Sequence, residues 1–251
     1  MDPIKAKLRS QKTRNEIGKE SPKNWRHSYS RQHQGRRTQG IDGKIFDSSR
    51  WIYGREVKIF RLTGVNPNVV KYVELGLMDR IDNIGLDFKV TLSLSDSRLE
   101  EYVRNSLGED NKIDISILSK YINTDQKRVI ENNETPFGYV LLTPFSFPKD
   151  EDVNYEYWGK SFFSTGYIAL SLPKKNQNSF GFIRKLTKHE AGHLFGLGEH
   201  HDDIDVQGYD INEECNMLGD VPTAHTCNKC LDAMVYFWKG IENRTGEKFF
   251  K

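Results

Sequence analysis

The sequence has only three cysteines, and all of them fall between residues 215 and 230. An odd, clustered set does not suit a disulfide framework and favours metal binding in a reducing compartment. The chain also has no apolar run long enough to cross a bilayer, and its first residues lack the apolar core of a secretory signal. These absences predict a soluble, cytoplasmic protein without a membrane partner.

Positive charge is concentrated in the N-terminal part of the chain. The first fifty residues contain 13 Lys or Arg and five Asp or Glu, a net charge of +8, whereas the whole chain carries only +2. Residues 1–44 are also poor in aliphatic side chains and lack the apolar groups that a packed core needs. We therefore predict a disordered basic tail at 1–44 and an ordered domain at 45–251. Such a tail is compatible with nucleic-acid binding, with a pro-segment that covers the active site, or with a merely solvated segment.

The ordered region alternates between strand and helix patterns. Strands are expected at 56–62, 86–94, 137–144 and 165–172, with an edge strand or loop at 155–163. Helices are expected from a cap at Asn66-Pro67 to Gly85, within 96–130, at 179–196 and at 228–243. Because the first helix stands between two strands, those strands should be parallel. The pattern predicts an α/β fold with an N-terminal subdomain at about 51–196 and a C-terminal one at about 197–251.

A zinc-binding pattern lies in the third of these helices. His189 and His193 are four residues apart, so both imidazoles project from one face of the helix, about one turn apart. Glu190 follows the first histidine, where a carboxylate can take a proton from a metal-bound water. The sequence therefore predicts a catalytic zinc site with Glu190 as its general base.

A third zinc ligand is expected in the loop that follows the helix. Gly196 allows the helix to end and the chain to turn under the metal. Glu199 stands at the expected position of the third ligand, and His200 comes directly after it. We prefer His200, since imidazole is the commoner ligand and Gly198 can absorb one extra residue, and we keep Glu199 as the alternative.

The cysteines predict a second, structural zinc site. Cys227 and Cys230 have the spacing of half a zinc clip, which Cys215 and one histidine would complete. His201 is the preferred fourth ligand, with His225 or Asp202 as alternatives. The acidic loop at 202–214 lacks a convincing calcium-binding spacing and is expected to be solvated.

Taken together, these motifs resemble the archaemetzincins, a family of metzincin-type zinc metalloproteases. In that family the long zinc motif is followed by Cys-x-Met and then by Cys-x-x-Cys. The present sequence has His189-Glu-x-x-His193-x-x-Gly196, Cys215-x-Met217 and Cys227-x-x-Cys230. The chain departs from the family in four ways: one residue is added before the third histidine, His201 replaces a cysteine, the loop to Cys215 is longer, and the stretch from Met217 to Cys227 is shorter.

The resemblance covers about residues 55 to 245 and implies a metzincin-like α/β (α+β) fold. In this fold a mixed twisted sheet carries the active-site helix, and a C-terminal subdomain holds a cysteine-rich zinc site and a last helix. It also implies two zinc ions. The catalytic ion would bind to His189, His193 and His200, with Glu190 as general base and Met217 in a methionine turn beneath the metal. The second ion would bind to Cys215, Cys227 and Cys230.

The expected function is hydrolysis of peptide bonds in a peptide or protein substrate by a zinc-activated water. One alternative is a DNA-associated zinc protease that is tethered by the basic tail. Another is a non-catalytic, zinc-dependent binding module, against which the intact Glu190 argues, because a structural site has no use for a base beside the metal.

Overall fold

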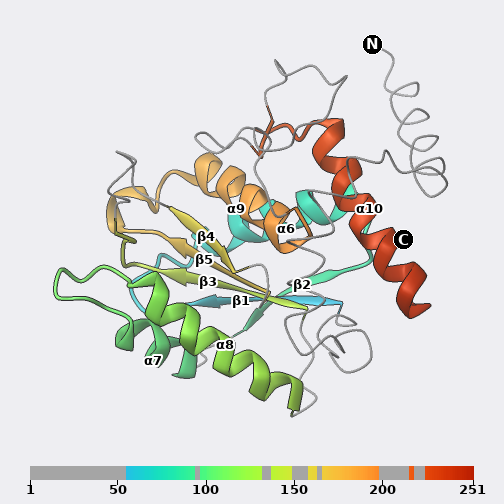
Figure 1. Cartoon of the computed structure of the whole chain (residues 1–251). Coiled ribbons are helices and arrows are strands. Elements are labelled where there is room, and N and C mark those ends of the chain that lie inside the picture. Colours follow the sequence, from blue (N-terminus) through green and yellow to red (C-terminus); the bar gives the residue numbers. More distant parts are fainter. Residues whose placement is uncertain are drawn as a thin grey trace.

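A mixed five-stranded sheet lies at the centre of the computed structural model (Figure 1), which describes residues 55–93, 97–131, 137–148, 158–162, 166–197, 215–217 and 224–251. Its order is β2-β1-β3-β5-β4. The strands are β1 (Glu56–Arg61), β2 (Lys89–Ser93), β3 (Gly138–Thr143), β4 (Gly159–Phe162) and β5 (Tyr167–Ser171). All neighbouring pairs are parallel except β4 and β5. The predicted mixed sheet is confirmed, and the stretch 155–163 supplies its antiparallel edge strand.

Helices cover both faces of this sheet. Figure 1 shows α6 (Val69–Ile84), α9 (Phe180–Leu194) and α10 (Asn228–Thr245) on one face, and α7 (Ser97–Asn105) and α8 (Ile115–Glu131) on the other. A short 3-10 helix, η3 (Lys174–Asn176), precedes α9. No helix in the described part of the chain is long and apolar enough to cross a membrane.

Side chains of the central strands point alternately to the two faces of the sheet, so these strands contribute to two apolar layers. In β3, Val140 and Leu142 belong to the layer beneath α6 and α9, whereas Tyr139 and Leu141 belong to the layer beneath α7 and α8. All six residues of β3 are buried, as expected for a parallel strand that is covered on both sides. The polar, helical stretch predicted at 96–130 therefore forms the second face of the molecule.

The predicted boundaries of the first helix need one correction. The side chain of Asn66 accepts a hydrogen bond from the Asn68 N–H at 3.0 Å, so it forms a turn ahead of the helix, and α6 begins only at Val69. The expected end is confirmed: Gly85 has a φ of 84° and donates its N–H to Ile81 O at 2.9 Å.

The second strand also starts later than predicted. Strand pattern begins at Leu86, yet β2 begins at Lys89. The backbone before it pairs with the C-terminal segment instead: Leu86 forms an antiparallel bridge with Phe250, and Asp87 N–H donates to Phe249 O at 2.8 Å. As predicted, β1 and β2 are parallel, and α6 connects them.

Close packing fixes α9 against α6 and α10. At Gly76 of α6, a Cβ atom would lie 2.8 Å from Thr187 Cβ and 3.2 Å from Lys188 N, so only glycine lets the two helices approach this closely. On the other side, the indole N–H of Trp238 in α10 donates to Phe195 O at 2.9 Å. Helix α9 is thus held from two directions just where the zinc-binding pattern stands.

The predicted boundaries near residues 44 and 196 stay predictions. The basic tail, the third zinc ligand and the acidic loop at 202–214 all lie outside the described residues.

Candidate metal centre

His189 and His193 present their rings side by side on α9. Their ring centroids are 5.1 Å apart, with the planes at 79°. His189 Nδ1 lies 2.6 Å from Asn216 O, and His193 Nδ1 lies 2.7 Å from Leu197 O. A carbonyl oxygen only accepts, so each Nδ1 must carry the proton, and each Nε2 keeps its lone pair. Both imidazoles are therefore held in the tautomer that binds zinc through Nε2.

The carboxylate of Glu190 is buried between α9 and the edge strand β4. Only 6 % of the surface of Glu190 is exposed to solvent. At Gly159 in β4, a Cβ atom would collide with Glu190 Oε1 and would lie 2.7 Å from its Cγ. The missing side chain at Gly159 thus creates the space that Glu190 fills, and no motif in the sequence marks this glycine.

Burial also sets the acidity of Glu190. It raises the pKa of Glu190 to about 8, against the opposing attraction of the Lys160 ammonium. A metal cation nearby would act in the same direction as Lys160 and lower this pKa, because a cation favours the carboxylate form. The group is therefore placed to exchange a proton near neutral pH.

Helix α9 ends as the zinc motif predicts. Gly196 has a φ of 112°, which disfavours any residue with a side chain, and a Cβ atom there would collide with Phe237 Cδ1 and would lie 2.7 Å from its Cγ. Leu197 N–H then donates to Gly192 O at 2.9 Å, and Leu197 O accepts the proton of His193 Nδ1. The turn that ends the helix thus also orients the second histidine.

The predicted third ligand falls just beyond this turn. His200 and its alternative Glu199 lie outside the described residues, as do His201 and Asp202.

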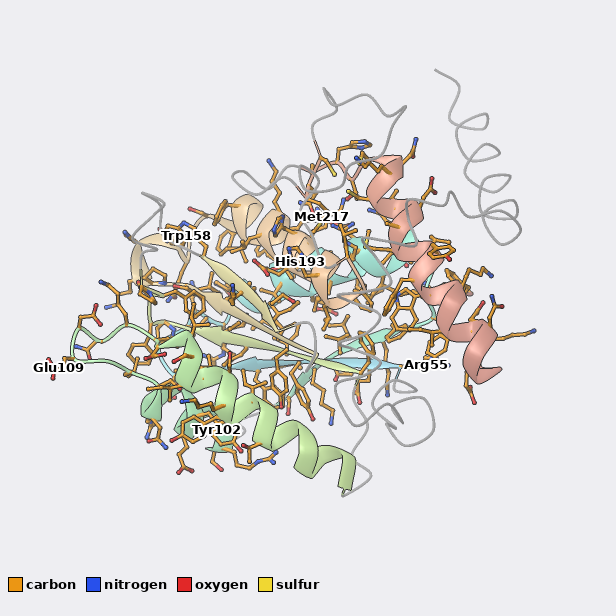
Figure 2. All side chains as sticks on the ribbon, viewed as in Figure 1. Arg55, Tyr102, Glu109, Trp158, His193 and Met217 are labelled. Atoms are coloured by element: carbon orange, nitrogen blue, oxygen red, sulfur yellow. The ribbon has the colours of Figure 1, made fainter. Side chains whose placement is uncertain are left out.

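Met217 lies against α9, next to the histidines. It is fully buried, and a Cβ atom at Gly192 would lie 2.8 Å from its Cε. Figure 2 shows Met217 and His193 on the same side of the sheet, the side that carries α9 and α10. Asn216, directly before Met217, supplies the carbonyl that orients His189. The Cys-x-Met segment is thus packed onto the helix that carries the zinc motif.

The three cysteines converge at the start of α10. Cys227 is the N-cap residue of that helix, and Cys230 lies in its first turn. The three sulfur atoms lie within 4.8 Å of one another, and those of Cys215 and Cys230 are 3.7 Å apart. Four tetrahedral sulfur ligands with Zn–S bonds of about 2.3 Å would be about 3.8 Å apart. The spacing therefore fits a zinc–thiolate site.

Hydrogen bonds already favour a thiolate at Cys215. Its contacts with the side chains of Cys227 and then Cys230 lower its pKa, and the backbone N–H groups of Cys227 and Met217 each donate to its sulfur at 3.4 Å. The same contact raises the pKa of Cys227 to about 11. His225 is exposed and is not part of the described cluster of ligand atoms. The fourth ligand stays a prediction.

Arg80 of α6 is a site residue that the sequence reading overlooked. It is fully buried, with hydrogen bonds to Lys188 O at 2.9 and 3.0 Å, Asn216 Oδ1 at 2.7 Å, Thr226 Oγ1 at 3.1 Å and Met217 Sδ at 3.3 Å. Burial lowers the pKa of Arg80 to about 10, although the three thiols oppose this shift. A signal was present, because Arg80 follows Leu77 by three residues on the apolar face of the helix.

Comparisons with solved structures find similar chains. A zinc-dependent peptidase from Methanocorpusculum labreanum matches with a TM-score of 0.48 and 16 % identity, over 71 % of this chain and 99 % of that one. An archaemetzincin from Methanopyrus kandleri matches with a TM-score of 0.49 and 14 % identity, over 74 % of this chain and 96 % of that one. No protein-family model and no curated protein matches the sequence.

Proposed function

We propose that this protein is a zinc-dependent metallopeptidase that hydrolyses peptide bonds. The observation that carries the proposal is the arrangement on α9: two histidines with their Nδ1 atoms hydrogen-bonded to backbone carbonyls, and a buried carboxylate directly after the first of them. His189 and His193 would hold the zinc ion together with His200, or with Glu199 in its place. Zinc when bound supplies Lewis acidity toward water and toward the scissile carbonyl.

The residues of the chain perform the proton transfers. Glu190 takes the proton of the attacking water and passes it to the amine that leaves. The burial that raises the pKa of this carboxyl helps it to keep the proton until the amine accepts it. The hydrogen bonds from Asn216 O and Leu197 O hold both imidazoles still, so that the ligands need no reordering during turnover. No covalent bond between enzyme and substrate is required.

The same proposal assigns a structural zinc ion to Cys215, Cys227 and Cys230, with His201 as the fourth ligand and His225 as the alternative. The mutual distances of the three sulfur atoms support it. This site has no open position for water if four protein ligands surround the metal, so its role would be to tie the Cys-x-Met segment to α10.

The decisive test replaces Glu190 with glutamine, which has the same shape but accepts no proton. We expect Glu190→Gln to lower peptide cleavage roughly 100- to 10,000-fold while the zinc content stays that of the wild type. The measurement is cleavage of an unfolded protein substrate, with zinc counted in parallel. Undiminished turnover by the variant would reject Glu190 as the base. Bound zinc without cleavage in the wild type would favour the non-catalytic binding module.

Nucleic acid is a second proposed partner, through the basic tail. The net charge of +8 in the first fifty residues favours it. Deletion of residues 1–44 should abolish salt-dependent binding to a DNA duplex and any stimulation of cleavage by DNA, and should leave cleavage without DNA unchanged. If the full chain shows no DNA binding at low salt, the tail has another role.

A further inference from the structure

Arg80 lies between the two candidate metal sites and contacts the supports of both. Its Nε and Nη2 atoms donate to Lys188 O, the residue before His189, and Nη2 also donates to Asn216 Oδ1. Nη1 donates to Thr226 Oγ1, the residue before Cys227. One side chain from α6 thus bonds to three segments that meet only in the folded protein.

The link to the histidine site runs through Asn216. Its backbone carbonyl orients His189, while its side chain is held on both sides, by Arg80 at 2.7 Å and by Lys185 O at 3.2 Å. Asn216 is fully buried. If Arg80 is removed, the residue whose carbonyl fixes the His189 ring loses one of the hydrogen bonds that hold its side chain.

The link to the cysteine site is electrostatic. A buried guanidinium is costly unless negative charge lies nearby, and in the described part of the chain no carboxylate forms an ion pair with Arg80. Attraction to the side chains of Cys230, Cys215 and Cys227, and then to Asp79, opposes the effect of burial on the pKa of Arg80, so the cysteine cluster lies close enough to compensate the guanidinium once its sulfurs are thiolates. Three thiolates, one neutral ligand and a divalent zinc ion carry one net negative charge, which a single guanidinium balances.

We propose that Arg80 is a positioning residue shared by both metal sites: it orients His189 through Asn216 and balances the charge of the zinc–thiolate centre. The inference rests on the proposed metal sites but not on catalysis. It predicts that the two sites are coupled, so that loss of one buried side chain weakens metal binding at both.

The test measures metal binding at each site separately in the full chain. Cobalt(II) replaces zinc as the probe, because cobalt bound to thiolates has a charge-transfer absorption in the near ultraviolet that cobalt bound only to histidines lacks. Equilibrium dialysis gives total bound cobalt, and the difference reports the histidine site. Arg80→Met should weaken binding at both sites by roughly tenfold or more, the effect expected for loss of a group that supports metal ligands.

The matched control is Arg184→Met on α9. Arg184 is exposed and pairs with Asp79 at 2.7 Å, the residue next to Arg80, so its loss removes the same charge nearby without touching either site. We expect wild-type cobalt binding. Equal binding by Arg80→Met and the wild type would overturn the inference.

Two further variants separate the two roles and keep the test informative if Arg80→Met does not fold. Arg80→Lys keeps the positive charge but not the several hydrogen-bond donors. It should therefore restore the cobalt–thiolate absorption more than it restores cobalt binding at the histidine site. Asn216→Ala keeps Arg80 but removes the connection, and should weaken the histidine site roughly tenfold with a smaller change in the thiolate band. The opposite pattern in either variant would contradict the assigned role. A wild type that binds no cobalt at the histidines would instead refute the proposed function.

Discussion

At the scale of single residues, the chemistry depends on groups that are buried yet retain specific partners. His189 and His193 each have one nitrogen committed to a carbonyl, while Glu190 is surrounded by protein on α9 and β4. A carboxyl group in this environment is easier to keep neutral than in water, since burial penalises its charged form. The consequence is measurable in the stability of the protein as well as in its activity.

Glu190 should make stability depend on pH when the histidine site is stripped of metal. Its folded pKa of about 8 lies above the unfolded value of 4.5, so its contribution is fully present below about pH 4.5 and is lost as the pH rises through about 8. Relative to Glu190→Gln, the wild type should therefore lose a few kcal/mol of unfolding free energy between about pH 5 and about pH 9.

Denaturant titrations of both proteins measure this difference, with a chelator mild enough to leave the thiolate centre loaded. Loading the histidine site with zinc is the control, because the cation stabilises the carboxylate and should shrink the pH dependence. Parallel pH profiles for the two proteins would show that Glu190 is already charged in the folded state.

At the scale of elements, the site depends on how tightly α9 packs against its neighbours. Glycines stand at three of these contacts: Gly76 of α6 and Gly159 of β4 face α9, and Gly192 of α9 faces Met217. At each one, a side chain would require the neighbouring element to move. The edge strand β4 is the contact closest to the chemistry, since it borders the carboxylate of Glu190.

Gly159→Ala should therefore displace Glu190 without removing it. We expect peptide cleavage to fall roughly 10- to 100-fold and stability to fall by about 1–3 kcal/mol, while zinc stays bound. Ser161→Ala is the matched control two residues along the same strand. The Ser161 Oγ is buried, and within the described part of the chain it has no hydrogen-bond partner, so its loss should leave cleavage unchanged. Normal cleavage by Gly159→Ala would mean that β4 can shift to accommodate the added methyl group without displacing Glu190.

At the scale of the whole molecule, the cysteine cluster joins the Cys-x-Met segment to α10, and α10 packs into the same core as the sheet. Trp238 of α10 is fully buried and bonds to Phe195 at the end of α9. Metal bound at the cysteines would therefore connect the C-terminal helix to the helix that bears the histidines. Removing it should loosen both.

A strong chelator should lower the melting temperature by about 10 °C, the shift expected when a ligand that binds only the folded state is withdrawn. Calorimetry with and without chelator measures it. Cys230→Ser should start from a lower melting temperature and respond less to the chelator, because its thiolate centre is already impaired. If the chelator lowers the melting temperature of Cys230→Ser as much as that of the wild type, the stabilising metal binds at another site.

The sequence alone was sufficient for features that depend on local spacing. His189, Glu190 and His193 share one helix, and Cys227 and Cys230 lie together at the start of another. The strand and helix periods follow from the alternation of buried and exposed residues. Each of these features can be recognised from a few neighbouring residues. One boundary was predicted wrongly because a distant segment pairs with it. The start of β2 is displaced because the backbone at Leu86 pairs with Phe250, which no local pattern reveals.

Only the tertiary structure decided which residues support the site. Arg80 and Lys188 are 108 positions apart, and Gly159 and Glu190 belong to different elements, yet each pair is in contact. A buried arginine and a glycine in an edge strand have many possible roles, and their spacing along the chain favours none of them. Their roles follow from packing, because side chains that meet across a core leave no periodic trace in the sequence.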